Sequence, residues 1–155
     1  RPGDAILVTG AFGRSIEGKH LTFTPRVSEA RQLQAMNVEI HAAIDVSDGL
    51  SLDLSRICAA SGCGAQVVVD KIPLSREATS HPDKDFGAPW HYALSDGEDF
   101  ELILAVPPDT AAQLLRDQPL SVPLSQIGNF TAKPGLMQQL PDGCTLPLQP
   151  RGYEH

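Results

Sequence analysis

Apolar residues follow two patterns along this chain of 155 residues. In some stretches they form short continuous runs rich in β-branched residues, which predict buried strands. In others they recur every three or four positions, which predicts helices with one buried face. On this basis we expect strands at 5–9, in the short apolar run that ends at Asp45, and at 66–70, 100–106 and 124–130. We expect helices at 25–37, from Leu50 to Gly62, and from 107–109 onward.

The order of these elements has no repeat of fixed period, which argues against a solenoid. A mixed sheet with helices packed on it accounts best for the order, so the expected fold class is α+β. Because 41% of the residues are hydrophobic, the chain can bury one good core, and we expect a single domain over residues 1–155. Residues 1–4 read as a turn that follows an earlier element, which indicates a fragment of a longer protein.

Two aspartates stand where the strand closed by Asp45 gives way to the helix. Ser47 is placed to cap that helix, Asp48 falls in its first turn, and Gly49 permits a close approach of the backbone. Such a junction can hold Mg²⁺ against phosphate oxygens, because Mg²⁺ takes one or two carboxylates together with substrate phosphates. The alternative is that these Asp and Ser side chains only cap the helix, as these residue types commonly do.

A second acidic cluster comes directly before the strand at 100–106 and contains Asp96, Glu98, Asp99 and Glu101. Four carboxylates within six residues repel one another, so a cation or a ligand rich in hydrogen-bond donors is expected beside them. The alternative is an exposed turn.

Glycines recur in the loop at 10–18, which follows the first strand. A loop of this kind can cradle phosphate with its backbone N–H groups. It lacks the Gly-Lys-Ser/Thr ending of a P-loop and the spacing of a dinucleotide fingerprint, so an ordinary mobile loop is the preferred interpretation. Arg26 and Arg31 follow in the next predicted helix. They can reach a phosphate, but we expect them instead to be solvated or to pair with Glu29 and its neighbours.

Charge and cysteine content narrow the function classes further. A formal net charge of -7 and scattered Lys and Arg residues argue against nucleic acid as a partner. No apolar stretch approaches the roughly 18 residues that span a bilayer, and nothing resembles a signal peptide, so we expect a cytoplasmic protein with no membrane partner. The three cysteines lack a C-x-x-C spacing, which predicts reduced thiols at Cys58, Cys63 and Cys144. We expect the histidines at 81 and 91, His81 and His91, to be surface or structural residues.

Several motifs, taken in order, resemble a known family. The segments at 45–50 (Asp-Val-Ser-Asp-Gly-Leu), 95–102 (Ser-Asp-Gly-Glu-Asp-Phe-Glu-Leu) and 152–155 (Gly-Tyr-Glu-His) are similar to the C-terminal half of thiamine-monophosphate kinases. That family belongs to the aminoimidazole ribonucleotide synthetase superfamily. The openings at 2–10 and 25–27 fit the same half, so the resemblance extends over essentially the whole chain.

The resemblance implies a mixed, largely antiparallel sheet and an ATP-dependent, Mg²⁺-dependent transfer of the γ-phosphoryl group to thiamine monophosphate, which gives thiamine diphosphate. It implies that Asp45 and Asp48 bind Mg²⁺ and that Ser47 contacts the nucleotide. Glu98 would meet the thiamine moiety, and Tyr153 would stack on one of its rings. From its residues alone, Tyr153 reads better as a hydrophobic latch for the chain terminus.

The family also implies an N-terminal half that supplies most of the ATP site, most of the metal-binding aspartates and a homodimer interface. Without that half, the chain is expected to fold but not to turn over substrate. Asp96 stands where the family has a glycine, and because aspartate adopts a positive φ more readily than most residues, the turn can survive. Two other functions stay open, namely a superfamily member with a different acceptor and a non-catalytic domain of this fold.

Overall fold

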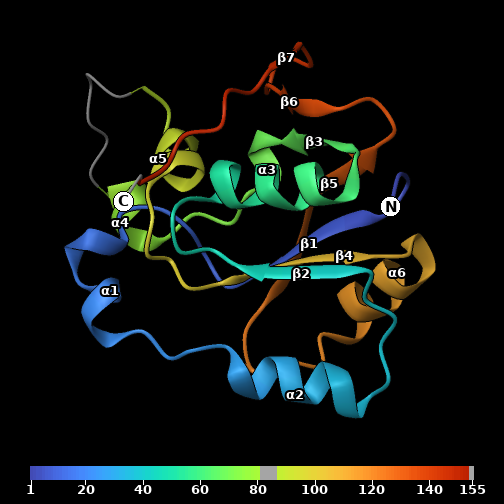
Figure 1. The fold of residues 1–155 in the computed structure, drawn as a ribbon. Coiled ribbons are helices and arrows are strands. Elements are labelled where there is room, and N and C mark those ends of the chain that lie inside the picture. Colours follow the sequence, from blue (N-terminus) through green and yellow to red (C-terminus); the bar gives the residue numbers. More distant parts are fainter. Residues whose placement is uncertain (81–86, 154–155) are drawn as a thin grey trace.

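The computed structural model describes residues 1–80 and 87–153, which form one seven-stranded sheet with helices on both faces (Figure 1). The strands are β1 (Ala5–Thr9), β2 (Ala42–Asp45), β3 (Gly64–Val68), β4 (Leu102–Val106), β5 (Leu124–Thr131), β6 (Gly135–Gln139) and β7 (Thr145–Pro147). Their order in the sheet is β2-β4-β1-β5-β3-β6-β7, and neighbouring strands are antiparallel except for the parallel pair β3 and β6. The predicted α+β class with a mixed, largely antiparallel sheet is confirmed.

Two hydrophobic cores lie on opposite faces of this sheet. The helices are α1 (Lys19–Thr22), α2 (Val27–Ala35), α3 (Leu50–Ser61), α4 (Arg76–Ser80), α5 (Trp90–Ser95) and α6 (Pro108–Asp117), with short 3₁₀ turns η1 (Ser15–Glu17) and η2 (Val69–Lys71). Figure 1 shows α3 and α5 over one face and α2 and α6 over the other. In β1, Ile6 and Val8 enter the core on the α3 side, whereas Ala5 and Leu7 enter the core on the α2 and α6 side. Because side chains alternate along a strand, β1 is apolar throughout only because both of its faces are buried.

The expected strands are found with small shifts at their ends. The strand at 5–9 is confirmed, β3 begins at Gly64 and gives way to η2, and β4 begins at Leu102 rather than at Phe100. β6 and β7 lie outside the predicted strands. The sequence of β6, Gly-Leu-Met-Gln-Gln, contains no β-branched residue, so its strand conformation comes from its parallel pairing with β3 rather than from local propensity.

The structure confirms the predicted start of one helix and the predicted end of another, and it corrects the predicted start of a third. α6 opens with a proline in its first turn, and α3 ends before Gly62, both as predicted. At that end, Cys63 N–H donates to the Cys58 carbonyl at 3.1 Å, as in a Schellman motif, and both cysteines are buried and free. α2, in contrast, starts at Val27 with Arg26 as its N-cap, so the start predicted at residue 25 is two residues too early.

Some predictions fall outside the described residues. They concern part of the surface segment at 79–89, including His81, and the last two residues of the terminal motif, Glu154 and His155. Over residues 1–80 and 87–153, no helix combines the length and apolar character needed to cross a bilayer.

Candidate functional site

Four segments that are far apart in the sequence meet at one cleft of about 940 Å³. The loop between β2 and α3 is joined to the loop between α5 and β4 by a hydrogen bond of 2.7 Å, which Glu98 N–H donates to the Ser47 carbonyl. The C-terminal tail is joined to the same loop by Tyr153 N–H, which donates to the Asp48 carbonyl at 2.8 Å. Gly152 makes this approach possible, because a Cβ at that position would lie 2.3 Å from the Asp48 carbonyl oxygen.

The predicted site residues do not all reach this cleft. Ser47, Asp48, Glu98 and Tyr153 line it together. Asp45 is not one of the residues that line it in the described part of the chain. Asp45 is exposed at the end of the edge strand β2 and pairs with Leu102 of β4. Residues directly opposite in an antiparallel pair share a face, so the Asp45 side chain lies on the α2 and α6 side of the sheet, where Leu102 packs.

Asp53, which carried no predicted role, holds the loop that bears Ser47 and Asp48. α3 begins at Leu50 with Gly49 as its N-cap, so the prediction that Ser47 caps the helix is wrong. The fully buried Oδ2 atom of Asp53 accepts hydrogen bonds of 3.0–3.2 Å from three successive backbone N–H groups, those of Ser47, Asp48 and Gly49. A carboxylate inside the helix therefore satisfies the donors that a preceding cap residue usually serves.

Arg56, one turn further along α3, gives Asp48 a positively charged partner. Its guanidinium donates to Asp48 Oδ2 at 2.5 Å and also to Asp53 Oδ1. The hydrogen bond to Asp48 raises the pKa of Arg56. Asp48 is 8% exposed, whereas the Arg56 side chain is 47% exposed, so this ion pair closes the solvent side of the loop.

The glycine loop at 10–18 is fastened to the second acidic cluster rather than standing alone. Arg14 N–H donates to Asp96 Oδ2 at 2.9 Å, and the Ser15 hydroxyl donates to the Gly97 carbonyl at 2.5 Å. Gly13 N–H donates to the carboxylate of Asp99 at 3.1 Å. Two segments that the sequence offered as separate candidates thus form one wall of the cleft.

Burial and charge affect the acids of this wall in opposite directions. Burial raises the pKa of Asp99 to about 7, although the positive charge of Lys19 and the Gly13 N–H lower it. Burial also raises the pKa of Glu101, but hydrogen bonds from Arg26 and Lys19 outweigh that effect and leave it lowered. Asp99 therefore titrates near neutral pH, whereas Glu101 is a stable anion.

The cation expected beside the acidic cluster is supplied by the chain itself. Arg26 donates to both oxygens of Glu101 at 2.7 Å, Lys19 Nζ donates to Oε1 at 2.9 Å, and the Thr9 hydroxyl donates to Oε2 at 2.8 Å. Arg26 was expected to be solvated or to pair with Glu29, but its hydrogen bonds go to Glu101 instead. Gly10 packs on the Glu101 carboxylate, since a Cβ there would lie 2.2 Å from Oε1.

Backbone strain falls on residues other than the one expected. Asp96 has a φ of -72°, so it does not need the positive φ that its glycine-like position suggested. Glu98 (φ 63°) and Phe100 (φ 52°) instead adopt the left-handed conformation. The Phe100 ring stacks on Phe23 at 3.9 Å between centroids, and Phe100 N–H donates to the Val46 carbonyl at 2.8 Å, which fixes this strained turn.

The carboxylates around the cleft can supply only part of the ligand shell of a magnesium ion. No group of three or more His, Cys, Asp or Glu side chains suited to a metal gathers in the part of the chain that the structure describes. The cleft offers the Asp48 carboxylate, whereas the Asp45 side chain lies on the α2 and α6 side of the sheet. One carboxylate fits Mg²⁺ when phosphate oxygens and other ligands complete its shell.

The family model for AIR synthase related protein, C-terminal domain, matches residues 11–137. The chain belongs to this family. The resemblance drawn from the motifs is thereby confirmed, and the match covers both β2 with its following loop and the acidic cluster.

Individual relatives agree with this assignment. Thiamine-monophosphate kinase from Rhodopirellula baltica is 42% identical over 153 residues, which cover 99% of this chain and 48% of that relative. The structure of AaThiL complexed with AMPPCP and TMP matches with a TM-score of 0.78 at 26% identity, over 100% of this chain and 52% of that one. Hydrogenase maturation protein HypE in complex with ATP matches with a TM-score of 0.75 at 19% identity, over 100% of this chain and 52% of that one, and shows a shared fold alone. The chain spans about half the length of the curated relatives it matches.

Proposed function

We propose that this chain is the C-terminal half of an ATP-dependent kinase that phosphorylates thiamine monophosphate to thiamine diphosphate with Mg²⁺. The observation that carries the proposal is the cleft in which Ser47, Asp48, Glu98 and Tyr153 meet. Support comes also from the relatives named thiamine-monophosphate kinase and from the AaThiL complex with AMPPCP and TMP.

The charges of the reactants explain why carboxylates belong in such a cleft. Donor and acceptor are both anionic, and phosphoryl transfer depends mainly on positioning and on neutralisation of charge. Bound Mg²⁺ supplies that neutralisation. In this proposal Asp48 holds the ion, without the Asp45 carboxylate that was expected to share it, and Ser47 contacts the nucleotide from the loop that Asp53 fixes.

The other side of the cleft suits the thiamine moiety. Glu98 presents an exposed carboxylate from a strained turn, and a carboxylate is a favourable neighbour for the cationic thiazolium ring. Tyr153, 64% exposed, is positioned at the mouth by its backbone bond to Asp48 and can stack on one of the rings. The rest of the nucleotide site, the homodimer and the cytoplasmic location belong to the same proposal for the longer protein.

Calorimetric titration of the longer protein with thiamine monophosphate in the presence of Mg²⁺ tests this function. We expect binding, and we expect Glu98→Ala to weaken it about tenfold or more, as loss of a charge partner at a ligand does. If Glu98→Ala bound thiamine monophosphate with unchanged affinity, Glu98 would not contact the substrate. Absence of thiamine monophosphate binding would favour a different acceptor or a non-catalytic domain. The isolated chain is expected to form no thiamine diphosphate.

A further inference from the structure

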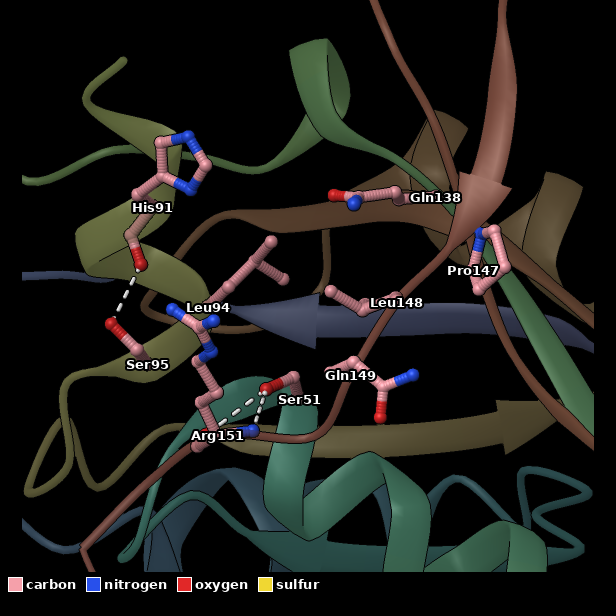
Figure 2. Close-up of a pocket in the computed structure, with 9 residues that line it drawn as sticks. All are labelled: Ser51, His91, Leu94, Ser95, Gln138, Pro147, Leu148, Gln149 and Arg151. Atoms are coloured by element: carbon pink, nitrogen blue, oxygen red, sulfur yellow. Dashed lines mark hydrogen bonds between the residues drawn. The ribbon is translucent and has the colours of Figure 1, made fainter. Parts of the chain in front are cut away.

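A second cavity, of about 490 Å³, lies beside the cleft and is not used by the proposed function. It is open to solvent on one side and lined by α5, the first turn of α3, β6 and the tail at 147–151, and Ser95 lines both the cavity and the cleft. Figure 2 shows the Gln138 amide and the Leu148 side chain pointing from one side toward Leu94, His91 and Arg151 on the other. Apolar and polar side chains therefore face the same space.

The backbone of Arg151 is clamped so that its side chain faces this cavity. The buried Ser51 hydroxyl accepts a hydrogen bond from Arg151 N–H at 3.0 Å and donates one to the Arg151 carbonyl, also at 3.0 Å. Within residues 1–80 and 87–153, the Arg151 guanidinium has no ion pair, although the chain carries a net charge of -7. No carboxylate belongs to the described lining of the cavity.

Two further side chains of the lining have unused hydrogen-bonding capacity. Gln138 Oε1 is buried and has no hydrogen-bond partner among the described residues. The His91 imidazole lies against the Trp90 ring with the two planes tilted by 35°, and it makes no hydrogen bond with the described residues. Burial lowers the pKa of His91, and the charge of Arg151 lowers it further, so His91 is neutral at pH 7 and Arg151 supplies the positive charge. A buried acceptor such as Gln138 Oε1 is rarely left without a partner, because it costs free energy when unmet. Arg151 is exposed, so its guanidinium is hydrated and accessible to an anion.

We propose that this cavity binds a small organic oxyanion that carries a hydroxyl or amino group and an apolar body. Arg151 pairs with the oxyanion, as guanidinium groups do with carboxylates and phosphates. The hydroxyl or amino group donates to Gln138 Oε1, and His91 offers one additional donor or acceptor. The apolar body packs against Leu94 and Leu148, which line the same space.

Occupancy of this cavity also bears on the neighbouring cleft. Tyr153 follows two residues after Arg151, and its N–H is bonded to the Asp48 carbonyl. An anion held by Arg151 therefore steadies the segment of the tail that forms one wall of the cleft.

The test uses probes that each lack one of the recognised features. 4-Hydroxybenzoate has the anion, the ring and the hydroxyl; benzoate lacks the hydroxyl, 4-hydroxybenzamide lacks the charge, and inorganic phosphate lacks the apolar body. 4-Hydroxyphenyl phosphate, in a separate arm, distinguishes a phosphate from a carboxylate ligand. Binding to the 155-residue chain is followed by calorimetry and by amide chemical shifts, which locate the probe without reference to kinase activity.

Arg151→Gln is the decisive variant, and Arg31→Gln is its matched control. Both remove one positive charge, but Arg31 is exposed on α2, outside the cavity. Because the clamp by Ser51 uses only backbone atoms of Arg151, the variant is expected to keep its melting temperature, which is measured in parallel. We expect Arg151→Gln to weaken 4-hydroxybenzoate binding about tenfold, and Arg31→Gln to change it by less than about twofold.

The proposal would be supported by amide chemical-shift changes centred on α5, β6 and the tail. It also requires that benzoate, 4-hydroxybenzamide and inorganic phosphate each bind more weakly than 4-hydroxybenzoate. It is overturned if no probe binds at concentrations up to about 10 mM, a limit that corresponds to a negligible affinity. Equal effects of Arg151→Gln and Arg31→Gln would overturn it, as would shifts centred on Glu98. Loss of thiamine monophosphate binding in the longer protein would refute the kinase proposal and leave this one unaffected.

Discussion

Asp53→Asn should loosen the loop that carries Ser47 and Asp48 while leaving the rest of the fold in place. The carboxylate accepts three backbone N–H groups through a single oxygen, and it is fully buried. Asparagine is nearly the same size and still offers an oxygen to these donors. The charge is lost, and the new amide N–H group faces Arg56, which is itself a donor.

The size of the effect follows from the change in hydrogen-bond type. A hydrogen bond to a charged acceptor contributes roughly 1.5–3 kcal/mol and a neutral one roughly 0.5–1.5 kcal/mol, so each bond is weakened by about 1 kcal/mol. Three bonds give a loss of about 3 kcal/mol in the free energy of unfolding. For a domain of this size, that loss lowers the melting temperature by about 6–12 °C.

Urea unfolding at pH 7 measures this loss, with Asp109→Asn as the control. Asp109 lies in the first turn of α6, as Asp53 does in α3, but it is exposed, so its removal should cost less than about 1 kcal/mol. An unchanged m-value would show that only stability has changed. A loss in Asp53→Asn no larger than in Asp109→Asn would refute the conclusion that this carboxylate holds the loop.

Two further variants test the charges around the cleft. Because the pKa of Asp99 is raised to about 7 in the folded state, the native protein binds its proton more tightly than the unfolded chain does, and the associated stability is lost as pH rises through 7. Asp99→Asn keeps an acceptor for Gly13 N–H but cannot titrate. Its free energy of unfolding relative to the parent, measured in urea, should therefore increase by about 3 kcal/mol between pH 5 and pH 8. A difference that stays constant over this pH range would contradict the raised pKa. Arg56→Gln removes one positively charged partner of the Asp48 carboxylate, so within the proposed function the Mg²⁺ affinity, measured by calorimetry, should rise roughly threefold to fivefold. Arg116→Gln, which breaks an exposed ion pair outside the cleft, should not change it. A lower affinity in Arg56→Gln would show that Arg56 holds Asp48 in place for the metal.

Local signals were enough to predict elements that are stabilised locally. The proline in the first turn of α6 and Gly62 after α3 set helix ends within their own neighbourhood, and both were predicted from the sequence. The cap of α3 was not, because its acceptor is Asp53, which lies inside the helix and reads as one more polar position between Leu52 and Leu54. An aspartate between two apolar residues in the first turn of a predicted helix is the sequence signal that could have indicated this cap.

Pairings between distant segments were beyond any local pattern. The acidic cluster indicated correctly that positive charge must be near, but Lys19 and Arg26 reach Glu101 from 82 and 75 residues away along the sequence. The charged residues were visible; their partners depended on β1 and β4 being neighbours in the sheet. For the same reason, the sequence placed Asp45 beside Asp48, whereas the pleat of β2 turns its side chain toward the α2 and α6 face.

The way the cleft is assembled explains why its side chains can serve a ligand. Ser47 and Glu98 are joined through their backbones, the carbonyl of one accepting the N–H of the other, so the junction does not depend on which side chains they carry. Glu98 nevertheless occupies the left-handed region, which costs a non-glycine residue about 1–2 kcal/mol. Its side chain is exposed, and glycine would adopt this conformation without that cost. A carboxylate placed at such a position against the preference of the backbone indicates a role outside the fold, and within the proposed function that role is to face the cationic ring of thiamine.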